Sequence, residues 1–176
     1  MHDLYKLFVS AKIPTQTPSD ANIGSINEAL WRKLAINTAI NPLTALLGEC
    51  NGFLADNEVA RSLSQATTLE TLEIAVAEGA LPKDTTTNLK ELATDVAKLS
   101  AKNRSSMFQD ISRGSRTEIE SMCGEVVRRA KKHGRSAPLN HLWLELIKKA
   151  EKNTKGSSGK SLYTIDDLTS LVSRSS

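Results

Sequence analysis

Three polar side chains recur at four-residue intervals in an otherwise largely apolar stretch, namely Lys33, Asn37 and Asn41. On an α-helix these positions fall within about 80° of arc and about 12 Å of axial length. An ammonium group and two amides on one face can converge on a polar ligand. The plainer interpretation is a solvated helix face, although asparagine is a poor residue for a helix interior.

Two further segments carry polar residues in suggestive places. Asn51 and Gly52 form a turn signal, and Asn103, Ser105 and Ser106 precede the apolar pair Met107-Phe108. The plain roles are a turn and the cap of a short helix. A helix N-terminus with free N–H groups and hydroxyls is also a natural site for a carboxylate.

A glutamate follows the next helix signal. Thr117 and Glu120 have the spacing of a capping box, and Glu118 lies directly after the capping residue. The plain role of Glu118 is a favourable negative charge at the start of a helix.

A run of basic side chains raises the question of a nucleic-acid or phosphate partner. The run comprises Arg128, Arg129, Lys131, Lys132, His133 and Arg135. It lies away from the apolar stripe of its helix and contains no interleaving aromatic residues, which favours a solvated face. We therefore expect no nucleic-acid partner.

The histidines and cysteines indicate no metal site. His2, His133 and His141 are scattered and lack the spacing of metal ligands. Cys50 and Cys123 make neither a disulfide framework nor a metal cluster, so a reducing intracellular compartment is the default. These residues predict a protein without a metal, located in the cytoplasm.

The composition is that of a globular domain rather than a membrane protein. Hydrophobic residues make up 39% and charged residues 24% of the 176 residues, which is enough for one domain with a sizeable core. The net charge of +3 is too small to imply a nucleic-acid or membrane partner. No apolar run approaches the roughly 20 residues that a bilayer span requires.

Apolar periodicity predicts helices throughout and no sheet. A helix starting at a Ser25/Glu28 capping box should kink or break at Asn41-Pro42 and continue as a second piece over residues 43–48. Further helices are expected over residues 56–79, 84–102, 117–134, 138–150 and 164–172. The prediction is an all-α bundle of about five or six helices.

The chain divides into three parts on this interpretation. Residues 1–24 form a lead-in, residues 25–152 an all-helical domain, and residues 153–176 a flexible linker followed by a short C-terminal helix capped by Thr164.

Two long segments resemble the signatures of the ketopantoate reductase family. The first runs from Trp31 through the Asn41-Pro42 pair to Asn51-Gly52, and the second spans residues 103–120. Residues 128–140 also follow the family pattern, so that the resemblance covers roughly residues 23–150. It implies the C-terminal helical domain of the 6-phosphogluconate-dehydrogenase-like, ketopantoate reductase type.

The same resemblance implies an NADPH-dependent enzyme that reduces ketopantoate to pantoate on the route to coenzyme A. Family members bind NADPH in an N-terminal Rossmann domain and the substrate in the cleft between the two domains. None of the nine glycines here occurs as G-x-G. Residues 1–24 would then be the end of a missing nucleotide-binding domain, and we expect this chain alone to be inactive.

The resemblance also implies roles for individual residues. Lys33 matches the general acid, and Asn37, Asn41 and Asn51 match positions that hold the polar groups of the substrate. Ser106 matches the serine that binds the substrate carboxylate.

Glu118 matches a catalytic-site glutamate near the nicotinamide ribose, and Asn103 is a further candidate for a cofactor contact.

The alternative to an enzyme is a helical dimerisation or interaction module. Such a module would self-associate, because the loss of a partner domain exposes an apolar cleft wall. A homodimer is compatible with either interpretation.

Overall fold

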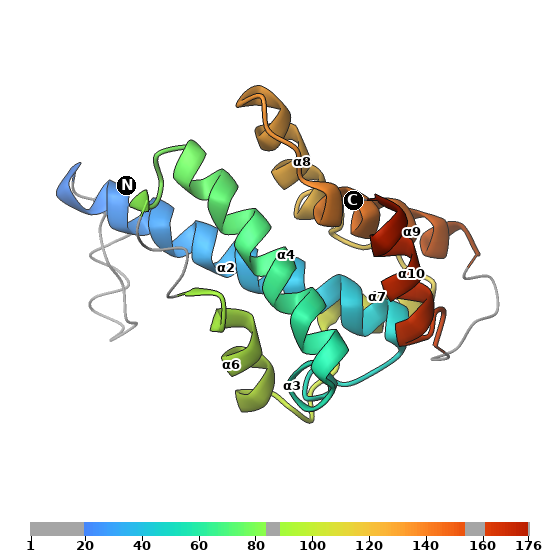
Figure 1. Cartoon of the computed structure of the whole chain (residues 1–176). Coiled ribbons are helices and arrows are strands. Elements are labelled where there is room, and N and C mark those ends of the chain that lie inside the picture. Colours follow the sequence, from blue (N-terminus) through green and yellow to red (C-terminus); the bar gives the residue numbers. More distant parts are fainter. Residues whose placement is uncertain (1–19, 84–88, 154–160, 176) are drawn as a thin grey trace.

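The computed structural model describes residues 20–83, 89–153 and 161–175. Within these ranges it has eight helices and no strand, which confirms the all-α prediction (Figure 1). The helices are α2 (Asp20–Leu47), α3 (Phe53–Asp56), α4 (Glu58–Ala77), α6 (Leu92–Leu99), α7 (Ser106–Arg113), α8 (Cys123–Lys132), α9 (Pro138–Asn153) and α10 (Ile165–Ser175). They outnumber the five or six expected, since the count left out α3, which follows the predicted turn at Asn51-Gly52, and α7, the short helix expected after Ser105.

Helix α2 is continuous where a kink or break was predicted. It passes through Pro42 and begins at Asp20, so Ser25 lies inside the helix and the predicted capping box is wrong. A proline in a helix interior costs about 3 kcal/mol. Burial of the surrounding apolar side chains offsets this cost, because Ile40 and Leu43 on either side of Pro42 are both almost fully buried.

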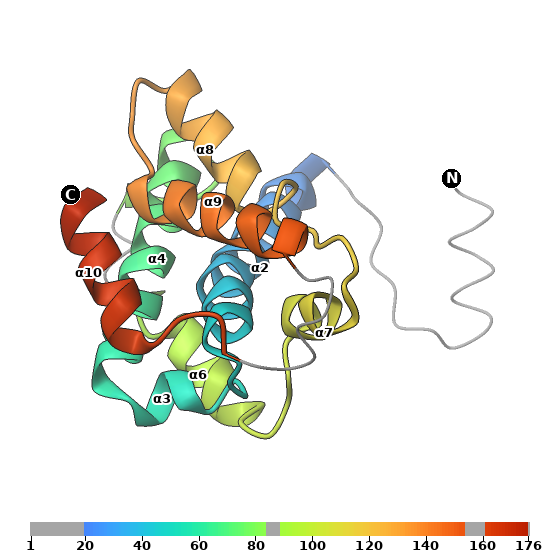
Figure 2. The same cartoon turned by 90° about the vertical axis from the view of Figure 1, so that its right-hand side faces the viewer.

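Helices α2 and α4 lie side by side and run in opposite directions at the centre of the molecule (Figures 1 and 2). Buried polar contacts join them to α9. The hydroxyls of Thr38 and Thr71 lie 3.0 Å apart, and Asn140 Nδ2 donates to Thr71 at 3.1 Å. Trp143 Nε1 donates to Thr67 at 2.9 Å. Because each contact satisfies a buried polar group, the three helices have a defined register.

The N-terminus of α9 is capped by a side chain from α4. Glu70 accepts hydrogen bonds from the backbone N–H groups of Leu139 and Asn140, at 2.9 and 2.8 Å. Burial is the main cause that raises the pKa of Glu70 above its ordinary value of 4.5.

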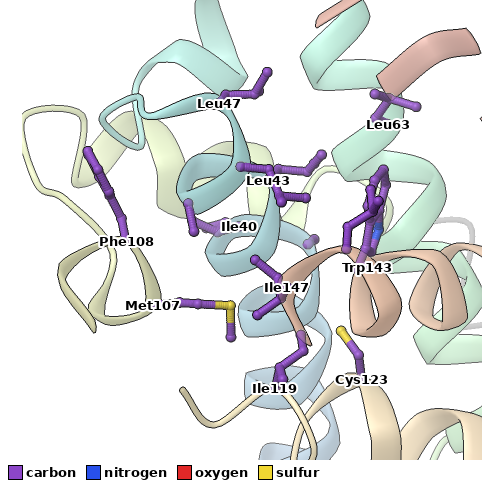
Figure 3. Close-up of a cluster of buried hydrophobic side chains, with 14 of the residues drawn as sticks. Ile40, Leu43, Leu47, Leu63, Met107, Phe108, Ile119, Cys123, Trp143 and Ile147 are labelled. Carbon is purple, nitrogen blue, oxygen red and sulfur yellow. The ribbon is translucent and has the colours of Figure 1, made fainter. Parts of the chain in front are cut away.

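The main core forms around the C-terminal half of α2. Ile40 and Leu43 of α2 are surrounded by three apolar side chains (Figure 3). These are Met107 from α7, Ile147 from α9, and Ile119 from the segment between α7 and α8. Helix α7 therefore packs firmly on α2.

Several helix boundaries differ from the predictions. Helix α6 begins at Leu92 rather than residue 84, although residues 84–88 lie outside the described part. Helix α8 begins at Cys123 rather than at Thr117, so the second predicted capping box is also wrong. Gly79 and Gly134 follow α4 and α8 with φ of 72° and 64°, which confirms them as helix-ending residues.

The C-terminal helix forms as predicted. Thr164 Oγ1 accepts a hydrogen bond from Asp167 N at 3.2 Å, which caps α10, and Leu168 is fully buried. The predicted linker falls mostly on residues 154–160, outside the described part, as do residues 1–19 of the predicted lead-in. Residues 20–24 of that lead-in belong to α2.

Candidate functional site

The polar stripe lies on an open face of α2. Lys33 is exposed, and Asn37 and Asn41 are half-buried. Within the described residues, none of the three side chains has a hydrogen-bond or ion-pair partner. The stripe therefore presents three polar groups that the domain itself does not use, and it leaves them open to solvent rather than enclosed.

This face leads to the N-terminus of α7. Thr44 is eleven residues after Lys33, which places it about 20° from Lys33 around the helix. Its hydroxyl is hydrogen-bonded to that of Ser105 at 2.8 Å, and both residues are buried. The contact joins the end of the α2 stripe to the start of α7. Helical spacing places Thr44 on the face of Lys33 but gives no sign of its partner Ser105.

The two adjacent serines at the start of α7 have different roles. Ser105 is the N-cap, and its side chain accepts from Phe108 N at 3.1 Å. Ser106 is the first residue of the helix and is exposed. Ser105 therefore caps α7, whereas the hydroxyl of Ser106 is exposed and free to bind a ligand such as a carboxylate.

Asn51 and Asn103 belong to two loop segments that lie beside each other. The Asn51 backbone N–H donates to the Asn103 carbonyl at 2.9 Å, and Gly52 N donates to the Ala101 carbonyl at 3.0 Å. Asn51 is only 8% exposed, whereas Asn103 is exposed. The predicted turn at Asn51-Gly52 is confirmed, and its partner segment leads directly to Ser105.

The exposed Asn103 lines a cavity of about 610 Å³. Its other lining residues are Lys102, Arg104, Gln109, Ser112 and Arg113. The cavity does not include Lys33, Asn37 or Asn41.

Glu118 is exposed in the turn between α7 and α8. The preceding residue is anchored, because Glu151 of α9 accepts from both the backbone N–H and the hydroxyl of Thr117, at 2.7 and 2.8 Å. Glu120 forms ion pairs with Lys148 and Arg128 instead of capping a helix. The backbone next to Glu118 is thus anchored to α9.

The basic run lies on the surface, and part of it forms ion pairs. Glu78 lies 2.7 Å from Arg129, 2.8 Å from His133 and 3.4 Å from Lys132. Arg129 also stacks over the Trp31 ring, with 5.7 Å between the guanidinium carbon and the ring centroid. These contacts give the run a structural role in joining α8 to α4 and α2.

Among the described residues, no three His, Cys, Asp or Glu side chains are grouped so that they could hold a metal ion, and no helix is long and apolar enough to cross a membrane.

Comparison with protein families gives a match over most of the chain. Residues 25–151 match the family described as ketopantoate reductase PanE/ApbA C terminal. A 2-dehydropantoate 2-reductase of Halobacterium salinarum is 32% identical over 145 residues, which cover 82% of this chain and 47% of that protein. A 2-dehydropantoate 2-reductase of Vibrio cholerae is 36% identical over 132 residues, which cover 73% and 42%.

Solved structures give the same result. A PanE/ApbA family ketopantoate reductase from Ralstonia eutropha matches with a TM-score of 0.74 and 28% identity, over 88% of this chain and 49% of that one. A dimeric ketopantoate reductase from Staphylococcus aureus matches with a TM-score of 0.64 and 25% identity, over 73% and 44%. The chain spans less than half the length of these curated relatives.

Proposed function

Because the chain belongs to the ketopantoate reductase family and corresponds to its C-terminal helical domain, we propose that it supplies the substrate-binding half of an NADPH-dependent 2-dehydropantoate 2-reductase. The reaction would reduce ketopantoate to pantoate, on the route to coenzyme A. A single observation supports this most strongly. The polar groups of Lys33, Asn37 and Asn41 have no partner among the described residues and lie on one face that ends beside the α7 N-terminus.

In the proposed mechanism Lys33 is the general acid. Hydride addition to the keto carbon of the substrate leaves negative charge on the keto oxygen. The Lys33 ammonium would stabilise that charge and donate one proton to the oxygen, which forms the hydroxyl of pantoate. The neutral amine would then recover its proton from solvent.

The amides and the serine would hold the substrate. Asn37 and Asn41 are neutral, so they can orient the polar groups of the substrate without competing for the proton. Ser106 would bind the substrate carboxylate, since an exposed hydroxyl at the first turn of α7 combines with free backbone N–H groups. Because the carboxylate and keto carbons of ketopantoate are bonded to each other, Ser106 and the Lys33 ammonium would contact neighbouring atoms at one end of the substrate.

NADPH would supply the hydride from its nicotinamide ring. Two residues of this chain fit contacts to that cofactor, because Glu118 and Asn103 are exposed and have acceptor oxygens suited to ribose hydroxyls. Most of the cofactor would be bound by a nucleotide-binding domain outside these 176 residues, which would also form the second wall over the open α2 face.

The test is NADPH oxidation, followed at 340 nm, with ketopantoate as substrate. This chain would be assayed alone and after mixing with the separately expressed nucleotide-binding half of the Vibrio cholerae relative, a mixture referred to below as the reconstituted reductase. We expect activity only in the mixture, and we expect NADPH titration to show no tight binding to the chain alone. Tight stoichiometric binding of NADPH by the chain alone would contradict the proposal that a separate nucleotide-binding domain binds most of the cofactor.

An interaction module is the second candidate function. The exposed side chains of Leu30, Val59 and Leu99 favour it, since large apolar groups on a surface promote association. Light scattering across a range of protein concentrations distinguishes a homodimer from a monomer.

We further propose a cytoplasmic location, consistent with Cys50 and Cys123 as free thiols.

A further inference from the structure

Asn51 has one polar atom without a partner, although the residue is almost fully buried. Its backbone N–H donates to the Asn103 carbonyl, and its carbonyl accepts from Leu54 N at 3.1 Å. Its side-chain Nδ2 donates to Ser100 Oγ at 2.9 Å. Within the described residues Oδ1 is buried and accepts no hydrogen bond.

The orientation of the Asn51 amide follows from the bonding of Ser100. The Ser100 hydroxyl donates its single proton to the Val96 carbonyl at 2.7 Å. Its oxygen can then only accept from Asn51, so the NH₂ end of the amide must face Ser100. The oxygen of the amide is therefore directed away from Ser100 as an unused acceptor.

The unused acceptor has an energetic consequence. A buried polar atom without a partner costs about 1–3 kcal/mol. A ligand that donates a hydrogen bond to Asn51 Oδ1 would recover this cost, whereas a carboxylate or keto oxygen would be repelled.

The turn at Asn51-Gly52 packs closely against the backbone of Ala101. A Cβ added at Gly52 would lie 2.8 Å from the Ala101 Cβ and 3.1 Å from its carbonyl oxygen. This close approach keeps the turn against the segment that leads to Asn103 and on to α7. Ser100, at the end of α6, and Asn51 thus meet beside the loop of Asn103, which lines the cavity at the start of α7.

From this geometry we infer that Ser100 is a positioning residue, which turns the Asn51 amide so that its oxygen selects a ligand with a hydroxyl donor. The inference rests on the proposed function for the identity of that ligand. Ketopantoate carries a hydroxyl group on its terminal carbon, and 3,3-dimethyl-2-oxobutanoate is the same keto acid without it.

The first experiment compares kcat/KM of the reconstituted reductase for these two keto acids. We expect Ser100→Ala to reduce the preference for ketopantoate about tenfold, mainly through KM, because a site built around a hydroxyl discriminates strongly against its absence. Ser100→Thr keeps the hydroxyl and should restore the preference. Ser62→Ala is the matched control, since Ser62 makes the same bond to a carbonyl four residues earlier and contacts no side chain amide.

The second experiment uses this chain alone and follows the Asn51 side-chain NH₂ by NMR. We expect slow hydrogen exchange in the wild type and in Ser62→Ala, and faster exchange in Ser100→Ala. Unchanged exchange in a folded Ser100→Ala variant overturns the inference, as does an equal loss of kcat/KM on both keto acids.

The two readouts separate the two proposals. If the wild-type mixture does not reduce ketopantoate, the proposed function fails, and the exchange experiment still decides whether Ser100 orients Asn51. If exchange changes as expected but the preference for ketopantoate does not, the assignment of the ligand hydroxyl to Asn51 is wrong.

Discussion

Glu151, near the end of α9, holds Thr117 by two hydrogen bonds, one from the backbone N–H and one from the hydroxyl. Thr117 is adjacent to Glu118, which we propose contacts the ribose of the cofactor. A contact between residues 34 positions apart therefore sets the place of a proposed site residue.

This anchoring predicts an effect of Thr117→Val on activity as well as on stability. The variant loses the hydroxyl donor to Glu151, and we expect about 1 kcal/mol less stability in denaturant unfolding. In the reconstituted reductase kcat/KM should fall several-fold. Glu118→Gln should cost less in the Thr117→Val background than in the wild type, because the two residues act through one loop.

The control is Thr169→Val on α10, where an exposed threonine hydroxyl donates to a carbonyl within its own helix. Strictly additive effects of Thr117→Val and Glu118→Gln on kcat/KM would show that the anchoring does not serve Glu118.

The role of Lys33 is tested by Lys33→Ala. We expect kcat of the reconstituted reductase to fall by at least about a hundredfold, because general acid catalysis contributes about 10²–10⁴-fold. The stability of the domain should hardly change, since Lys33 is exposed and has no ion-pair partner among the described residues. Lys149→Ala, an exposed lysine on α9, is the matched control. Near-normal turnover of Lys33→Ala would exclude Lys33 as the acid.

The adjacent serines at the start of α7 predict opposite phenotypes. Ser105→Ala removes the N-cap and the contact with Thr44, so thermal unfolding should show a loss of about 1–2 kcal/mol. Ser106→Ala removes an exposed hydroxyl, so stability should be retained while KM for ketopantoate rises about tenfold. If KM is unchanged in Ser106→Ala, this serine does not bind the carboxylate.

The sequence predicted local features better than contacts between distant segments. Gly79 and Gly134 end their helices as expected, because an αL glycine depends only on its neighbours. The capping box at Thr117 was wrong because both of its members bind partners on α9, Thr117 to Glu151 and Glu120 to Lys148. Such tertiary partners leave no trace in local spacing.

In the candidate site, too, the local features were predictable and the contacts between distant segments were not. The common face of Lys33, Asn37 and Asn41 follows from helix geometry, and α2 realises it as one helix despite Pro42. The contact of the Asn51 side chain could not be predicted, because its partner Ser100 is 49 residues away. The turn signal at Asn51-Gly52 predicted the backbone conformation but not the burial of the Asn51 side chain.

The ion pairs of Glu78 predict a pH-dependent contribution to stability. The hydrogen bond with His133, followed by the charge of Arg129, lowers the pKa of Glu78 below its ordinary value of 4.5. The folded state then binds fewer protons than the unfolded state between the two pKa values, so stability rises with pH through this window. The contribution is fully present above pH 4.5 and is lost as the pH falls through the pKa of the folded state.

We therefore expect Glu78→Gln to be less stable than the wild type at pH 7, by about 1 kcal/mol for a partly exposed ion-pair cluster. The difference should shrink as the pH falls below 4.5, because the wild-type carboxylate is then protonated as well. Urea unfolding at a series of pH values measures it, with Glu49→Gln, an exposed glutamate, as the control. A stability difference that stays constant down to pH 2 would show that Glu78 acts through packing and not through its charge.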